Sequence, residues 1–237
     1  MNDELKFTVI SDTHYYSKKN FVDGFDKNKK PKPGQLFFSR SEEIVEHTFD
    51  CLCKNDTPDI VLISGDLTYN GERTSHDEMK AALKKLQQKG KRVYVITATH
   101  DYTTPRMPTY GIDKNDKYIE VESVNRTQLL KYYGDFGYNN AIAKHKSTMS
   151  YVAQLADGYR LFALNDDYGD PDCGFSDELM NWVKTEANNA KRDGQYIIAM
   201  THHPLVPPSP IYAAVAKGDM LNEYELRRNQ LSDLGFD

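Results

Sequence analysis

Short runs of apolar residues alternate with amphipathic segments along this chain. The runs cover residues 7–11, 59–64, 92–97, 159–165 and 195–201. They are rich in β-branched and aromatic residues and too short for helices, which is typical of strands buried on both faces. Between them, residues 39–54, 72–89 and 176–193 repeat apolar side chains at helical spacing. Strands that alternate with helices predict a layered α/β fold. Residues 149–155 add an antiparallel partner for the strand at 159–165.

Two long connections interrupt this alternation, at residues 15–38 and 102–122. Connections of this length are usually functional or disordered. The first contains a lysine-rich stretch over residues 18–32, which leaves the same end of the sheet as Asp12. Such a stretch raises the local concentration of a phosphate ester, or it is simply a solvated charged loop. Both interpretations are open at this point.

Composition narrows the possible classes of protein. The 237 residues fit one domain, and 35 acidic against 30 basic residues give a net charge of -5. This balance argues against general binding to nucleic acids or anionic membranes. No apolar run reaches the roughly 18 residues of a membrane span. Three cysteines form neither a disulfide framework nor a metal motif, and the start of the sequence lacks a secretory apolar region. A cytoplasmic location is expected, with a secreted or anchored parent as the alternative.

Metal-ligand types of side chain follow four of the predicted strands. They are Asp12 and His14, Asp66, His100 and Asp101, and His202 and His203. In an open α/β sheet the carboxyl ends of the strands line one crevice, so we expect these side chains to converge. Carboxylates and imidazoles together suit Mn, Fe or Zn. Each motif alone is compatible with a helix cap or a turn. That explanation does not account for the occurrence of metal-ligand residue types after four separate strands.

The remaining histidines, His47, His76 and His145, fall in helical or loop contexts away from these strand ends. They are expected at the surface.

Four motifs occur in a fixed order across nearly the whole chain: ISDTH (10–14), SGDLTYNGE (64–72), ATHD (98–101) and THHP (201–204). This order resembles the calcineurin-like metallophosphoesterase superfamily, especially its bacterial phosphodiesterases of the cyclic-nucleotide type. The resemblance implies one domain over residues 1–237, built as an αββα sandwich of mixed sheets flanked by helices. It also implies hydrolysis of a small phosphoester, more specifically a phosphodiester, by a metal-bound hydroxide. Two divalent or trivalent metal ions would be the cofactors.

The resemblance further implies a role for each matching residue. Asp12 and His14 would bind the first metal ion, Asp66 would bridge both ions, and His202 would bind the second. Thr99 stands where the family has an asparagine ligand. His100 would lie beside the substrate phosphate as the catalytic residue, with Asp101 orienting its ring. Tyr102 and Arg106 follow directly and suit a nucleoside or aryl group, or else they pack the loop.

Two departures from the family pattern qualify these expectations. A threonine hydroxyl is a weaker ligand than an asparagine amide, and no histidine follows His203, so the final Gly-His-x-His of the family is missing. The chain is then a truncated form, a short variant with a partial site, or a fold kept for binding a phosphorylated ligand without turnover. Asp166 and Asp167 are substitute ligands by position, but the more economical interpretation makes them solvated turn residues.

Overall fold

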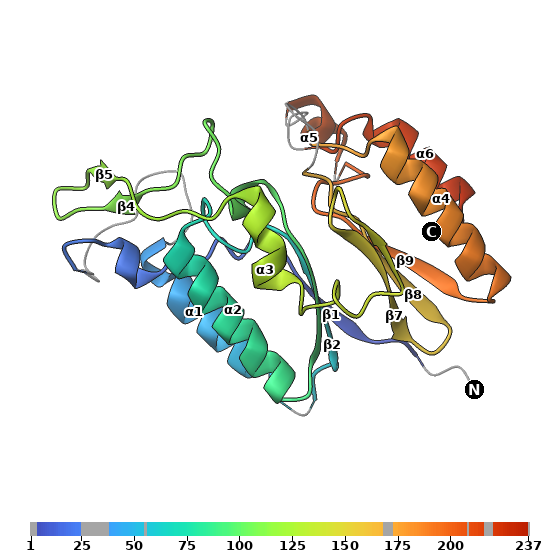
Figure 1. Ribbon diagram of the computed structural model, residues 1–237, viewed down its shortest axis with the longest axis horizontal. Coiled ribbons are helices and arrows are strands. Elements are labelled where there is room, and N and C mark those ends of the chain that lie inside the picture. Colours follow the sequence, from blue (N-terminus) through green and yellow to red (C-terminus); the bar gives the residue numbers. More distant parts are fainter. Residues whose placement is uncertain are drawn as a thin grey trace. The chain divides into compact units, whose positions relative to one another are not determined.

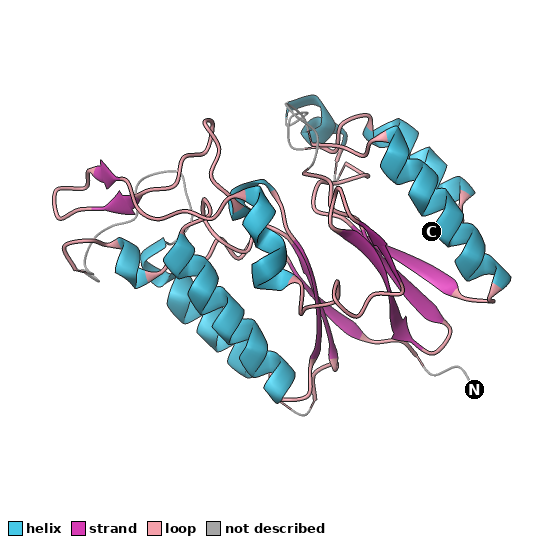
Figure 2. Ribbon diagram, in the orientation of Figure 1, coloured by secondary structure: helices cyan, strands magenta, loops and turns pink. Residues whose placement is uncertain are grey.

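The computed structural model describes residues 4–24, 38–54, 56–167, 173–207, 209–215 and 220–236 (Figure 1). The chain forms two compact units, Met1–Phe136 and Gly137–Asp237. Each unit combines a β-sheet with helices, as the colouring by secondary structure shows (Figure 2). The predicted fold class, mixed sheets flanked by helices, is therefore confirmed. Within the described ranges, no helix has both the length and the apolar character that a membrane crossing requires.

The first unit is built on a parallel sheet of three strands, in the order β1-β2-β3. These strands are β1 (Phe7–Ile10), β2 (Ile60–Ser64) and β3 (Arg92–Ile96). The central strand β2 is buried along its whole length, as predicted. The same prediction is wrong for β1, because β1 forms an edge of the sheet and its Val9 is 57% exposed.

Helices α1 (Phe38–Leu52) and α2 (Arg73–Gln88) lie side by side against this sheet (Figure 1). Their apolar stripes supply core residues, namely Val45, Phe49 and Leu52 from α1 and Met79, Leu83 and Leu86 from α2. Gly90 ends α2 with a φ of 87°, a conformation that glycine adopts without a steric penalty. The short η3 (Arg126–Gln128) and α3 (Leu129–Tyr133) complete this side.

The two long connections of the first unit contain short regular elements. Residues 15–24 include η1 (Lys18–Asn20), and Phe21 pairs with Ile112 of β4. The remainder of this connection, residues 25–37, lies outside the described residues, and so does most of the lysine-rich stretch. The second connection follows η2 (Thr99–Asp101) and contains a two-stranded sheet of β4 (Gly111–Ile112) and β5 (Tyr118–Ile119).

The second unit contains a mixed sheet in the order β6-β7-β8-β9. Its strands are β6 (Ala143–His145), β7 (Ser150–Ala156), β8 (Tyr159–Ala163) and β9 (Tyr196–Met200). The pairing of β7 with β8 is antiparallel, which confirms the predicted strand pair. β8 and β9 are parallel, joined through α4 (Asp177–Arg192). Ser176 caps α4 by accepting a hydrogen bond from the Leu179 N–H. Helix α4 and helix α6 (Tyr224–Asp233) pack on this sheet, while α5 covers Pro210–Val215.

The assignment of strands to sheets corrects one expectation. The four strands that end in ligand-type residues do not share a single sheet. β1, β2 and β3 belong to the first unit, whereas β9 belongs to the sheet of the second. Apolar periodicity identifies a strand but carries no information on its neighbours, so the sequence pattern could not separate the two sheets.

A buried carboxylate, Glu72, stands immediately before α2. Its side chain is fully buried and accepts hydrogen bonds at 3.1 and 3.2 Å from the backbone N–H of Asn70. Burial raises the pKa of Glu72 to about 7, against the opposing effect of hydrogen bonds from the backbone and from Ser75. Glu72 thus fixes the loop between β2 and α2, and its carboxylate is protonated more readily than that of an exposed glutamate.

The raised pKa predicts a pH dependence of stability. Between pH 4.5 and pH 7 the folded protein retains a proton on Glu72 that the unfolded chain has released. This retained proton stabilises the folded state, and its contribution to the free energy of unfolding is complete below pH 4.5. The contribution is lost as the pH rises through 7, and the free energy of unfolding falls by at most about 1.4 kcal/mol per pH unit. We expect Glu72→Gln to remove this slope from the free energy of unfolding, measured by urea denaturation. Glu120→Gln, at an exposed position, should keep it, and identical slopes in both variants would contradict the assignment.

Candidate metal centre

The parallel register of the first sheet brings three loops to one edge. Ile10 of β1 pairs with Ile63, and Ser64 of β2 pairs with Ile96 of β3, so the three strands end at the same level. The loops after β1 and β2 then continue side by side. The N–H of Asp12 donates to the Gly65 carbonyl at 3.2 Å, and that of His14 donates to the Asp66 carbonyl at 3.0 Å. The predicted convergence of the residues after these three strands is therefore observed.

Three of the predicted ligands adopt an unusual backbone conformation. Asp12, His14 and Asp66 have φ values of 55°, 38° and 51°. Residues other than glycine seldom occupy this region, although aspartate, asparagine and histidine do so more often than others. Such conformations collect at functional sites, where the surrounding structure holds them in place. Here the hydrogen bonds between the two loops provide that support.

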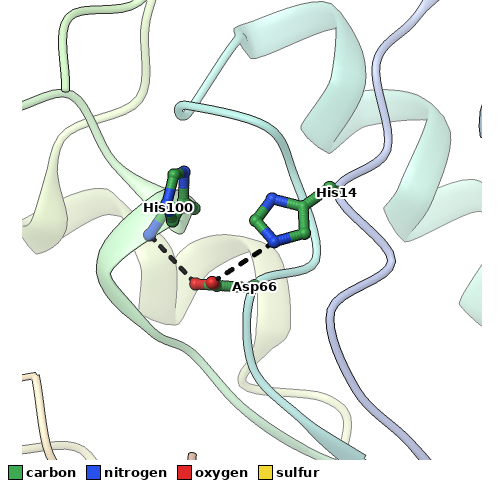
Figure 3. Close-up of side chains that lie close together, drawn as sticks. All are labelled: His14, Asp66 and His100. Carbon is green, nitrogen blue, oxygen red and sulfur yellow. Dashed lines mark hydrogen bonds and ion pairs between the residues drawn. The ribbon is translucent and has the colours of Figure 1, made fainter. Parts of the chain in front are cut away.

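The side chains of these residues converge on the imidazole of His14. Its Nε2 lies 3.6 Å from Asp12 Oδ1 and 3.5 Å from Asp66 Oδ2. The His100 ring meets the His14 ring edge to face, with centroids 4.7 Å apart. One possible ligand atom from each of His14, Asp66 and His100 lies within 4.8 Å of the others. Figure 3 shows Asp66 in contact with both histidines, through the ring of His14 and the backbone of His100.

This spacing fits a bound cation. The separations of 3.5 and 3.6 Å exceed the 2.7–3.2 Å of ordinary N–H···O hydrogen bonds. Ligand atoms at about 2.1 Å from a tetrahedral zinc ion lie about 3.4 Å apart, close to what is observed. Two carboxylates and an imidazole also form the mixed oxygen and nitrogen donor set that Mn, Fe and Zn accept. The His14 imidazole therefore lies at a ligand-to-ligand distance from both Asp12 and Asp66, and the three residues offer the donor types of a metal site.

Asp66 connects the cluster to the loop that carries His100. Its side chain is nearly fully buried, and Oδ1 accepts a hydrogen bond from the backbone N–H of His100 at 3.0 Å while Oδ2 faces His14. Charge-assisted hydrogen bonds of this kind are stronger than neutral ones. One carboxylate thus sets the position of the His100 backbone relative to the candidate metal ligands.

The ring of His100 is oriented by two oxygen atoms. Its Nδ1 lies 2.6 Å from the Tyr69 carbonyl and 2.8 Å from Asn70 Oδ1. The Asn70 amide nitrogen donates to the Pro108 carbonyl, so its oxygen is the end that faces His100. Both partners accept hydrogen bonds, which places a proton on Nδ1. In the neutral ring, Nε2 then keeps its lone pair.

Sequence reasoning missed Asn70, because an asparagine before a glycine is typical of a turn. Its position inside the motif SGDLTYNGE, four residues after Asp66, was the available signal.

Asp101 is fully buried between the two loops. Its Oδ1 accepts a hydrogen bond from the Thr68 N–H at 3.0 Å, and its Oδ2 accepts one from the Ala98 N–H at 2.9 Å. These bonds tie the loop after β3 to the loop after β2. The described contacts of Asp101 therefore hold the backbone on both sides of His100, while its predicted effect on the His100 ring stays a prediction.

His76 corrects the prediction of a surface position. It is fully buried on α2, with Nδ1 2.6 Å from the Tyr133 hydroxyl and Nε2 3.0 Å from the Asp101 carbonyl. Burial lowers its pKa to about 3, with the Asp101 carbonyl acting in the opposite direction. A neutral His76 thus supports the loop that carries His100. Its position three residues before Met79, on the apolar face of α2, was the signal for burial.

His145 is also buried, with Nδ1 2.9 Å from the Thr148 hydroxyl, so the surface prediction is wrong there as well. His47 is exposed, as predicted.

The other predicted site residues lie on the segment that follows β3. Thr99 begins η2 and is half-buried beside His100. The ring of Tyr102 lies 5.5 Å from the Arg126 guanidinium, a cation–π contact. Arg106 is exposed in a bend. The ligand role of Thr99 and the substrate roles of Tyr102 and Arg106 stay predictions.

In the second unit, the loops after the parallel strands β8 and β9 also meet. Asp166 Oδ2 accepts hydrogen bonds from the Thr201 hydroxyl and from the N–H groups of His202 and His203, at 2.5, 3.1 and 2.8 Å. Its Oδ1 lies 3.1 Å from Nδ1 of His203. Asp166 and Asp167 are both buried, so the interpretation as solvated turn residues is wrong. Asp166 fixes the backbone of His202, whose role as a metal ligand stays a prediction.

His203 is paired with Asp166 in this loop. Burial lowers the pKa of His203, but the hydrogen bond to Asp166 and further interactions with Asp166 and Cys173 outweigh it and raise that pKa to about 10. The expectation that His203 is a neighbour of the site and not a ligand stays a prediction.

Comparisons with known proteins place this geometry in context. A search of curated proteins by sequence finds no match. Among solved structures, the chain is similar to a dimetal phosphatase from Danio rerio. The two are 11% identical, the match covers 95% of this chain and 76% of that chain, and the TM-score is 0.61. At this identity the likeness shows the fold alone.

A scan against protein families matches the calcineurin-like phosphoesterases over residues 5–234. The match contains every motif on which the resemblance in the sequence rests. The chain therefore belongs to the calcineurin-like phosphoesterase family.

Proposed function

We propose that the protein hydrolyses a phosphoester with the help of metal ions held by Asp12, His14 and Asp66. The observation that carries the proposal is the spacing of these side chains, with His14 Nε2 3.5 and 3.6 Å from two carboxylates at the ends of parallel strands. The family assignment supports the same reaction class. A bound metal ion would supply Lewis-acid stabilisation of the negative charge that builds up on the phosphoryl oxygens.

His100 is the residue of the chain that we assign to catalysis. Its ring adjoins the His14 ring, so a phosphate at the metal centre would lie beside it. With Nδ1 held by Tyr69 and Asn70, only Nε2 can exchange a proton with a substrate or water oxygen. The neutral ring accepts a proton or a hydrogen bond there, and the imidazolium donates one. Asp101 has the supporting task of holding the loop backbone.

The finer features of the site rest on the sequence resemblance. They include two metal ions, drawn from Mn, Fe and Zn, with Asp66 as the bridge and with His202 and Thr99 as ligands of the second ion. They also include a phosphodiester substrate, inferred from the segment 64–72, and contacts of Tyr102 and Arg106 with that substrate. We carry these features forward as parts of the proposal.

A second candidate is a protein that binds a phosphorylated ligand without turnover. The observation that favours it is Thr99, which replaces the asparagine ligand of the family pattern with a shorter hydroxyl. Release of product distinguishes the two candidates. A hydrolase and a binding protein would both bind metal and phosphate, but only the hydrolase would release product.

Within the candidate site, the first prediction concerns metal removal. After dialysis against a chelator, we expect no hydrolysis of bis-p-nitrophenyl phosphate, and Mn²⁺ should restore it. Asp12→Asn should weaken Mn²⁺ binding at least tenfold in calorimetry, since a neutral amide replaces a carboxylate ligand. The Asp12 side chain is 55% exposed, so this variant should fold. Full turnover without metal would overturn the proposal, and bound metal without turnover would favour the second candidate.

The second prediction concerns His100. We expect His100→Ala to lower kcat by about 10²- to 10⁴-fold, the usual contribution of a general acid or base. The amount of bound Mn²⁺, measured by elemental analysis, should stay at the wild-type level. His47→Ala, at an exposed position of α1, serves as the matched control and should retain full activity. Unchanged turnover in His100→Ala would remove the catalytic assignment.

The third prediction tests whether Asn70 acts through His100. Asn70→Ala removes one of the two oxygens that orient the ring, and we expect kcat to fall roughly tenfold, less than in His100→Ala. The double variant should be no slower than His100→Ala alone, because Asn70 has nothing left to position. Multiplicative losses in the double variant would instead show an independent role for Asn70.

A further inference from the structure

A cavity of about 270 Å³ lies in the first unit, between the loop that follows β1 and helix α1. It is lined by Ile10 at the end of β1, by residues 11–14 of the loop, and by Ser41, Ile44, Val45, Thr48 and Phe49 of the helix. Two of the lining residues, Asp12 and His14, are the first candidate metal ligands. The cavity therefore adjoins the candidate metal centre.

The wall of the cavity along α1 is mostly hydrocarbon. Ile10, Ile44, Val45 and Phe49 contribute hydrocarbon surface. Four hydroxyl side chains also line it. Ser11 donates to the Asp12 carboxylate, and the other three donate to backbone carbonyls. Thr13 bonds Leu67 at 2.8 Å, Ser41 bonds Tyr16 at 3.1 Å, and Thr48 bonds Ile44 at 2.7 Å. A ligand in the cavity therefore meets hydrocarbon along α1 and polar side chains at the end formed by Ser11, Asp12 and His14.

Ile44 shows that this apolar surface is not covered by the rest of the described unit. It is 49% exposed, whereas its neighbours Val45 and Phe49 are buried in the core. Single exposed isoleucines are common. An exposed isoleucine that lines a cavity next to a polar cluster is the arrangement expected of a ligand site, in which apolar walls supply affinity and a few polar groups fix orientation.

The volume sets the size of the group that fits. An apolar cavity of about 150 Å³ holds one benzene molecule, so 270 Å³ accommodates an aromatic ring or an alkyl chain of similar bulk. A nucleoside is a poor match, because its base and sugar would lose hydrogen bonds to water and find few replacements here. The chemistry of the walls therefore selects an apolar substituent.

We propose that this cavity binds an apolar aryl or alkyl group of the phosphoester while the phosphate lies at the metal centre that Asp12 and His14 would form. The inference rests on the proposed function and adds a substrate class to it. It also names Ile44 as a residue that determines specificity. Burial of apolar substrate surface against Ile44, Val45 and Phe49 provides the preference.

The test uses diesters that share a p-nitrophenyl leaving group and carry methyl, butyl or phenyl as the second group. With the Mn²⁺-loaded protein, we expect kcat/KM to rise at least tenfold from methyl to phenyl. Ile44→Trp should fill the cavity and remove most of this rise. His47→Trp, which adds the same bulk at an exposed position of α1 outside the cavity, should behave like wild type.

A binding measurement keeps this inference separate from the proposed reaction. Calorimetry with the Mn²⁺-loaded protein should show tighter binding of phenylphosphonate than of methylphosphonate, and Ile44→Trp should abolish the difference. If the protein hydrolyses no diester, the proposed function fails, and the calorimetric difference still decides whether the cavity binds apolar groups. Equal rates for all three esters, or equal affinities for the two phosphonates, would overturn the inference.

Discussion

The parallel pairing of β1, β2 and β3 is the constraint on which the candidate site depends. Because the strands are in register, their carboxyl ends lie at one level, and the loops that follow them start side by side. Those loops then bond to one another through backbone N–H and carbonyl groups at Asp12 and His14. A shift of β1 by one residue would exchange the faces on which its side chains point and would move Asp12 and His14 away from Asp66. The register of the sheet therefore determines the relative positions of the candidate ligands.

Buried carboxylates hold these loops in place through hydrogen bonds. Asp101 and Glu72 lie under the first site and accept hydrogen bonds from backbone N–H groups, and Asp166 does the same in the second unit. Loops at strand ends leave backbone N–H groups without partners in the sheet, and a carboxylate accepts several of them at once. The cost of burying its charge is offset only when such donors are present. These three residues therefore fix the backbone of loops that carry candidate site residues.

The sequence was informative where local pattern determines structure. Apolar runs located β1, β2, β3, β8 and β9 to within two residues, and helical spacing located α1, α2 and α4. The residues after three of those strands were correctly expected to converge, because parallel strands meet at their carboxyl ends.

The sequence pattern was insufficient where contacts with distant segments determine the burial or the role of a side chain. The burial of His76 depends on Tyr133 and on the loop after β3, and that of Asp166 depends on the loop after β9. Asn70 resembles an ordinary turn residue until the fold brings His100 to its amide oxygen. In each case a side chain acquires its role from a segment at least 25 residues away along the chain, and a periodicity of two or 3.6 residues contains no information on such a partner.

The surroundings of the candidate centre differ from one side to the other, and this difference has a consequence for substrate orientation. On the side of α1, beyond Asp12 and His14, the wall is hydrocarbon. On the side of the loop after β3, His100 presents Nε2 with its lone pair or proton. A phosphoester has a charged phosphoryl group and organic substituents, and the first is stabilised by polar contacts while the second is stabilised by apolar ones. Binding an apolar substituent along α1 would therefore direct the phosphate toward His100. The apolar surface of α1 and the polar side at His100 would then together select the substrate and align it for reaction.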